Sequence, residues 1–194
     1  MTKPREDTDV ASQLTGPRPE PTAAPREGRR YTVYVVPHTH WDREWYQPFQ
    51  VFRARLVDVI DRVLQLLAGD PRYRRFSLDG QAVVLDDYLE IRPEREAEIA
   101  TRVQEGKLRI GPWYVLADEF LVSPEALIRN LEHGIRRCQD FGEPLPVAYT
   151  PDSFGHIAQL PLLAAGFGLD TIVFERGVGD EGERLRGEFH WTAA

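Results

Sequence analysis

Short apolar runs alternate with longer amphipathic segments between residues 31 and 174. Runs of three or four apolar residues are typical of buried strands. We expect strands at 33–36, 76–78, 108–110, 147–149 and 171–174. Segments with apolar residues three or four positions apart predict helices. These lie at 51–68, 82–91, 94–105, 124–138 and 160–165. Strands that alternate with helices predict an α/β fold with a parallel sheet or a β/α barrel.

Local signals support the limits of these helices. The helix at 51–68 presents one apolar face, made by Phe52, Leu56, Val59, Ile60, Val63 and Leu67, and Gly69 closes it. Pro93 separates the next two helices, because proline cannot continue a helix at an interior position. Ser123 before Pro124 predicts an N-cap followed by the first helical residue. The buried stripe of that helix comprises Leu127, Ile128, Leu131, Ile135 and Cys138.

The first 29 residues differ from the rest of the chain. They contain Pro4, Pro17, Pro19, Pro21 and Pro25 and almost no large apolar residue. Such a segment buries too little apolar surface to offset the entropy of ordering. We therefore predict a disordered tail at 1–29 and a folded domain at 30–194.

Composition narrows the classes of function. The chain has 194 residues, a net charge of −7 and a single cysteine, Cys138. The negative charge argues against a nucleic-acid or membrane-surface partner. The sequence shows neither a bilayer-spanning apolar segment nor a secretory signal, so we expect a cytoplasmic protein. One cysteine excludes a thiolate-rich zinc site, and any metal must use nitrogen and oxygen ligands.

The candidate chemistry begins directly after the first predicted strand, at His38-Thr39-His40-Trp41-Asp42. Alternate residues of an extended segment point the same way, so His38, His40 and Asp42 can converge on one point. Imidazole nitrogens and carboxylate oxygens are ligands for Zn²⁺. A solvated turn with a chance histidine pair is the alternative for this motif taken alone.

Further polar side chains follow the other predicted strands. They are Asp79 after 76–78, Trp113, Asp118 and Glu119 after 108–110, Asp152 to His156 after 147–149, and Arg176 after 171–174. Ligands of parallel α/β folds bind at the carboxyl ends of the strands, where these residues gather. Pro151 and Gly155 predict a tight turn that presents Asp152, although an ordinary helix cap is the alternative. A metal held by His40, Asp42 and Asp152 could coordinate sugar hydroxyls.

Four blocks of this sequence together resemble glycoside hydrolase family 38 α-mannosidases, in order and spacing. They are His38-Thr39-His40-Trp41-Asp42-Arg43-Glu44-Trp45, Gly111-Pro112-Trp113 with Asp118-Glu119, Pro151-Asp152-Ser153-Phe154-Gly155-His156, and Glu175-Arg176. The resemblance covers about residues 31–194, and around His40-Trp41-Asp42-Arg43-Glu44-Trp45-Tyr46 it is strongest to bacterial members, which include mannosylglycerate hydrolases. It implies the N-terminal part of a distorted β/α barrel and a zinc-dependent, retaining exo-α-mannosidase that acts on mannose-containing glycosides.

Position by position, the resemblance implies roles for seven residues. His40 and Asp42 match zinc ligands, and Asp152 matches a residue that is both zinc ligand and nucleophile. Trp45 matches an aromatic residue beneath the mannose ring, Phe154 one that lines the same pocket, and Arg176 a polar wall residue beside the nucleophile. His38 matches a histidine that is not a ligand. We expect His156 to be a packing residue or to support the ligands from behind.

The sequence also departs from the family pattern. The family's fourth zinc ligand and its acid/base aspartate would lie beyond residue 194, so we expect an N-terminal fragment that is inactive alone. Asp118 and Glu119 are possible substitutes as acid/base, but surface-loop roles are expected. Two other functions stay open: a metal-dependent carbohydrate deacetylase, and a catalytically silent mannose-binding module. Product analysis on an aryl α-mannoside and an acetylated sugar distinguishes a deacetylase from a mannosidase. Sugar binding without turnover would indicate the mannose-binding module.

Overall fold

The computed structural model describes residues 30–179, 182, 184–185 and 187–193. The predicted tail at 1–29 lies outside these residues. The chain divides into two units, Met1–Val35 and Val36–Ala194. The described part of the first unit, residues 30–35, has no regular secondary structure. The helices and strands found among the described residues all belong to the second unit.

The predicted strand at 33–36 is wrong. These four residues are not paired as a strand, and Val33 is 78% exposed. Pairing begins downstream instead: His38 forms a parallel bridge with Ser77, and Ser77 N–H donates to the carbonyl of Pro37. The partner strand β1 (Phe76–Ser77) has two residues, and its hydrogen bonds to this part of the chain involve Pro37 and Thr39.

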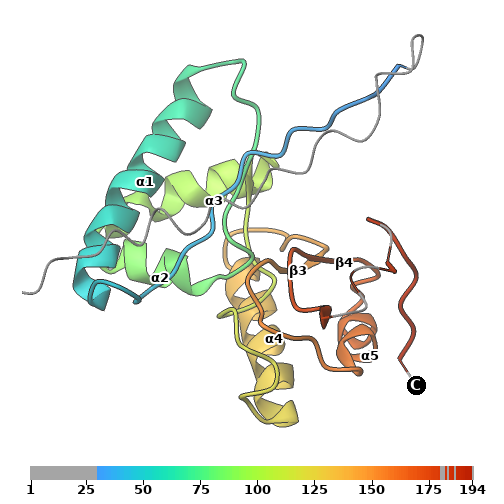
Figure 1. Ribbon diagram of the computed structural model, residues 1–194. Helices are drawn as coiled ribbons and strands as arrows, with labels where there is room; N and C mark the ends of the chain where they lie inside the picture. Colours follow the sequence, from blue (N-terminus) through green and yellow to red (C-terminus); the bar gives the residue numbers. More distant parts are fainter. Residues whose placement is uncertain (1–29, 180–181, 183, 186, 194) are drawn as a thin grey trace, which may run out of the picture. The chain divides into compact units, whose positions relative to one another are not determined.

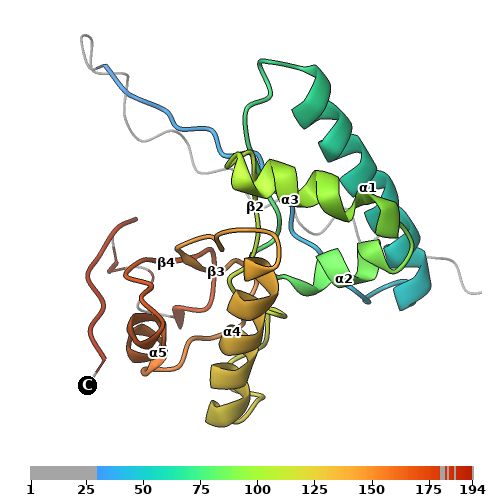
Figure 2. The same cartoon turned by 180° about the vertical axis from the view of Figure 1, so that it is seen from behind.

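The first helices pack around one core (Figures 1 and 2). α1 (Phe49–Gly69) contacts α2 (Val83–Leu89) and α3 (Glu96–Gln104), with the 3₁₀ turn η2 (Pro93–Arg95) between them. The predicted apolar face of α1 is buried except for Val59, which is partly buried. Tyr88 of α2 and Ile99 of α3 are fully buried in the same core. Residues of the strands β1 and β2 (Leu108–Arg109) belong to this core as well. Burial of the shared apolar surface therefore stabilises the packing of the helices on the strands.

The later elements form a second core. α4 (Pro124–Gln139) starts as predicted, because the Ser123 hydroxyl accepts a hydrogen bond from the Ala126 N–H at 3.2 Å. β3 (Ala148–Thr150) and β4 (Ile172–Phe174) flank α5 (Leu160–Gly166) in sequence. Leu131 of α4 packs with Trp113, Ala148, Leu160 and Ala164. Ile128, expected in the buried stripe of α4, is 41% exposed.

The strands pair in parallel, as the alternation of elements predicts. Phe76 pairs with Leu108 in the β1–β2 sheet, and Tyr149 pairs with Val173 in the β3–β4 sheet. Each sheet has two strands among the described residues, so an α/β fold with small parallel sheets is confirmed. No helix in the described part of the chain is both long enough and apolar enough to cross a bilayer.

Candidate metal centre

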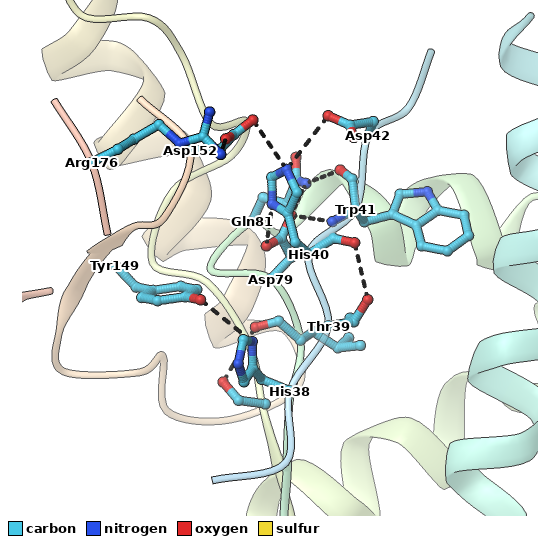
Figure 3. A network of polar contacts seen from close by, with 12 residues as sticks. His38, Thr39, His40, Trp41, Asp42, Asp79, Gln81, Tyr149, Asp152 and Arg176 are labelled. Atoms are coloured by element: carbon cyan, nitrogen blue, oxygen red, sulfur yellow. Dashed lines mark hydrogen bonds and ion pairs between the residues drawn. The ribbon is translucent and has the colours of Figure 1, made fainter. Parts of the chain in front are cut away.

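Three of the residues singled out from the sequence form one cluster. Ligand atoms of His40, Asp42 and Asp152 all lie within 4.8 Å of one another. His40 Nε2 is 3.5 Å from an Asp42 oxygen and 3.4 Å from an Asp152 oxygen, so the imidazole lies between the two carboxylates (Figure 3). The set of one neutral nitrogen donor and two carboxylates suits a borderline cation such as Zn²⁺.

A buried carboxylate supports His40 from behind. Asp79 is 0% exposed and lies 3.0 Å from His40 Nδ1, on the side away from the cluster. The Trp41 N–H donates to Asp79 at 2.6 Å, and the Gln81 side-chain amide donates to it at 2.7 Å. A carboxylate that accepts from Nδ1 leaves Nε2 as the metal-binding nitrogen, as in carboxylate–histidine–zinc arrangements.

The same contact controls the charge of His40. The hydrogen bond with Asp79 raises the pKa of His40 to about 9, against the lowering effect of burial. Without a metal, the imidazole is therefore protonated at neutral pH and faces the two carboxylates with an N–H. A metal ion would replace that proton, so metal binding releases it.

Close packing brings Asp79 to this position. Gly80 has φ +72°, and a Cβ there would be 3.0 Å from the backbone oxygen of Tyr149. The chain after β1 can thus approach β3, which leads directly to Asp152. The sequence placed Asp79 at the end of a strand but gave no sign of its contact with His40, 39 residues away.

His38 lies apart from the cluster. Its Nδ1 is 3.4 Å from the Tyr149 hydroxyl, and its ring is edge-on to the tyrosine ring (Figure 3). The expectation that three alternate side chains meet at one point is therefore wrong for His38. The bridge with Ser77 holds residue 38 beside β1, and the side chain turns toward Tyr149.

Arg176 holds one oxygen of Asp152. Its guanidinium is 2.8 Å from Asp152 Oδ1, which leaves the second oxygen, Oδ2, toward His40. The guanidinium also lies over the Phe154 ring, 5.2 Å from its centre. Asp152 is thus shared between a cation from the end of β4 and the cluster.

The cluster opens into a pocket of about 400 Å³. Its wall includes Asp118, Phe154 and Gln81 besides the three cluster residues. Phe154 is 72% exposed, and Trp45 is 75% exposed next to Tyr46, outside the lining. Both aromatic side chains are available for contact, and neither is needed by the core.

The two acids after Trp113 differ in surroundings. Asp118 lines the pocket and accepts a hydrogen bond from the Phe154 N–H at 3.0 Å. Glu119 is 4% exposed, and its two oxygens contact His156 Nδ1 and the Ile157 N–H. The expected surface-loop role is wrong for Glu119, because both of its oxygens are bound inside the fold.

An ion pair fixes the loop that carries Asp42. Arg43 contacts both oxygens of Asp87 on α2, at 2.6 and 2.8 Å. The Asp87 side chain is 8% exposed, so this bidentate pair links the loop to the first core. Nothing in the sequence spacing indicated a partner 44 residues away.

Comparison with known proteins identifies the family of this chain. Residues 30–194 match the model of the glycosyl hydrolases family 38 N-terminal domain. The chain is 48% identical over 152 residues to a provisionally named mannosylglycerate hydrolase of Halalkalibacterium halodurans, covering 78% of this chain and 17% of that protein. Human alpha-mannosidase 2C1 is 28% identical over 153 residues, covering 76% of this chain and 14% of that protein.

Solved structures give the same result. An alpha-mannosidase from Enterococcus faecalis V583 superposes with a TM-score of 0.71 at 44% identity, over 72% of this chain and 16% of that chain. The chain therefore spans about a sixth of the length of these relatives. The match over residues 30–194 places this chain in glycoside hydrolase family 38, as its N-terminal domain.

Proposed function

We propose that this chain supplies the metal-binding and nucleophilic part of a zinc-dependent, retaining exo-α-mannosidase. The observation that carries the proposal is the cluster of His40, Asp42 and Asp152, with Asp79 behind the imidazole. The names of the relatives support an α-mannoside as the substrate. Because the chain spans about a sixth of their length, the activity is proposed for the whole protein that carries it.

The donor set fits zinc. His40 offers Nε2, and Asp42 and Asp152 each offer a carboxylate oxygen. Bound there, zinc would supply a Lewis acid for the hydroxyls of the mannose. The fourth ligand is proposed to follow residue 194, as the family resemblance implies. The domain at 30–194 would then form the first part of a distorted β/α barrel, preceded by a tail at 1–29.

Asp152 is the proposed nucleophile. An Asp152 oxygen attacks the anomeric carbon, the glycosidic C–O bond breaks, and the leaving oxygen takes a proton from a general acid. Water then attacks the anomeric carbon and gives its proton to the same residue, now a base, which frees Asp152. Arg176 positions the carboxylate through Oδ1 in both steps.

The substrate would lie against the exposed aromatic side chains. Trp45 is proposed to stack beneath the mannose ring, and Phe154 to line the pocket wall. The acid/base is proposed to lie beyond residue 194. Asp118 is the first alternative to test, because it lines the pocket and Glu119 does not.

Labelling by a fluorinated mannosyl probe tests the nucleophile. In the protein that carries this chain, mass spectrometry should find the probe on Asp152, and Asp152→Ala should abolish both labelling and turnover of an aryl α-mannoside. Asp118→Asn, which replaces a pocket carboxylate with a carboxamide of the same size, is the control, and this variant should still be labelled. Label on another residue would contradict the assignment. Release of acetate from an acetylated sugar without mannoside turnover would instead indicate a deacetylase.

A further inference from the structure

His156 and Glu119 form a buried ion pair that is linked to the proposed nucleophile, Asp152, through Arg176. His156 Nδ1 is 2.8 Å from a Glu119 oxygen, with the two side chains 3% and 2% exposed. The other Glu119 oxygen accepts a hydrogen bond from the Ile157 N–H at 2.9 Å. Glu119 therefore has no oxygen free for the pocket, and its contacts fix the imidazole of His156.

The second nitrogen of His156 holds a backbone carbonyl. His156 Nε2 is 2.8 Å from the oxygen of Arg176. Both ring nitrogens face acceptors, so the imidazole donates from both and carries a positive charge. The raised pKa of His156 agrees with this: burial lowers it, but the hydrogen bonds with Glu119 and Arg176 outweigh burial.

Aromatic side chains and a glycine pack around the His156 ring. Its ring contacts Phe174 of β4, with centres 4.6 Å apart, and lies edge-on to Trp191 at 6.2 Å. Gly177 has φ +93°, and a Cβ there would be 2.9 Å from His156 Nε2 and from the Ser153 oxygen. The residue after Arg176 must therefore be glycine for the carbonyl to reach the imidazole.

Resting on the proposed function, we propose that His156, anchored by Glu119, is a positioning residue for Asp152. It fixes the Arg176 backbone, so that the guanidinium reaches Asp152 Oδ1 and turns Oδ2 toward His40. Without that anchor, a side chain that is 53% exposed would have to hold the nucleophile alone. Misplacement of a reacting group by about 1 Å can cost about 100-fold in rate.

Two substitutions at position 156 separate positioning from packing. Asparagine can place its amide nitrogen near Nδ1 and keep the bond with Glu119, whereas glutamine can place its nitrogen near Nε2 and keep the bond with Arg176. Both remove the ring from Phe174 and Trp191. His156→Asn should lower kcat about 10- to 100-fold with KM within about threefold, and His156→Gln should stay within about fivefold of wild type.

The two variants should rank in the opposite order for loss of thermal stability and for loss of kcat. His156→Gln leaves the buried carboxylate of Glu119 without its main partner, so its Tm should fall further than that of His156→Asn. Catalytic losses that follow the order of Tm would overturn the proposal, because they would indicate a structural role only. In an Arg176→Gln background, His156→Asn should add no further loss of kcat, and full additivity would also overturn it.

Zinc titration of the same variants gives a readout that does not need turnover. His156→Asn should weaken zinc binding about tenfold, because Asp152 Oδ2 is no longer directed at the cluster, and His156→Gln should leave it near wild type. Gly177→Ala, which keeps both side chains, should resemble His156→Asn. Absent mannoside turnover in the wild type would reject the proposed function, and the order of zinc affinities would still decide the role of His156. Equal zinc affinities in the wild type and all of these variants would reject the positioning role of His156.

Discussion

The two sides of the candidate metal centre are held in different ways. His40 rests on Asp79, which is fully buried and also binds Trp41 and Gln81. Asp152 is about one-third exposed and is held by Arg176, whose side chain is 53% exposed. The residue proposed only to bind metal is fixed by the core, whereas the residue proposed to react is held at the surface of the pocket.

This difference suits the proposed chemistry. A metal ligand that does not change during the reaction binds better from a rigid position, because its conformational entropy is already lost when the protein folds. A nucleophile must form and break a bond with the sugar while it stays near the metal, so its carboxylate has to shift. An exposed guanidinium permits such a shift, and the buried pair behind it limits the shift to the side chain.

Removing Asp79 should have the largest effect. Asp79→Ala leaves the half-buried Trp41 N–H and one N–H of the Gln81 amide without this acceptor, whereas the Gln81 amide keeps its bond with the Trp41 carbonyl. Each lost bond should cost about 1–3 kcal/mol of unfolding free energy. Loss of a carboxylate behind a ligand histidine should also weaken zinc binding about 10- to 100-fold. Urea unfolding and zinc titration measure the two effects. Asp70→Ala removes a partly exposed carboxylate that pairs with Arg72 and accepts from its backbone N–H, so it should cost less unfolding free energy than Asp79→Ala and leave zinc binding unchanged.

The pH dependence of stability and of zinc affinity should report on His40 in particular. Because the folded-state pKa of His40 is about 9 and its ordinary value is 6.5, the stability from its protonation is fully present below pH 6.5 and is lost as pH rises through 9. Zinc competes with the same proton, so zinc affinity should fall about tenfold for each pH unit below 9.

Melting curves with a chelator and zinc titrations between about pH 6 and 10 measure these trends. The difference in Tm between wild type and His40→Gln, both with chelator, isolates the contribution of His40. A zinc affinity that does not change with pH over this range would contradict the contact between His40 and Asp79 as the cause.

Breaking the Arg43–Asp87 pair should have a smaller effect on the same side. Arg43→Met keeps the length of the side chain but leaves the Asp87 carboxylate, 8% exposed, without its guanidinium partner. We expect a loss of about 1–3 kcal/mol of unfolding free energy, because Arg43 is itself partly exposed. Arg129→Met, at an exposed pair within α4, is the matched control and should lose less than about 0.5 kcal/mol. Equal losses would show that the Asp87 site is not special.

The sequence predicted the helices better than the first strand. Apolar spacing placed α1 within two residues at its start, and the Ser123–Pro124 signal placed the start of α4. A run of valines predicted a strand at 33–36, yet strand pairing depends on a partner, and the two-residue β1 pairs with His38 instead. The spacing of apolar residues describes a single segment, which is enough to predict a helix. The pairing register of a strand depends on that strand and on its partner together.

The site was predictable as far as residue types and strand ends define it. His40, Asp42 and Asp152 were selected from ligand chemistry and family resemblance, and they lie together. The contacts that orient them were not predictable. The carboxylates of Asp79 and Glu119 act on histidines 39 and 37 residues away, and no local pattern encodes such pairs.

The exposed aromatic side chains should separate binding from stability. Trp45 is 75% exposed and outside the core, so Trp45→Ala should change the unfolding free energy by less than about 0.5 kcal/mol. The same change should raise KM for an aryl α-mannoside, because a stacked sugar ring loses an aromatic contact worth about 0.5–1.5 kcal/mol, or about 2- to 13-fold in affinity. Chemical denaturation and steady-state kinetics measure the pair of effects, with Leu162→Ala, at an exposed leucine of α5 outside the pocket lining, as the control for KM. If Trp45→Ala lowers stability substantially and leaves KM unchanged, Trp45 is a packing residue and the substrate contact has to be assigned to another side chain.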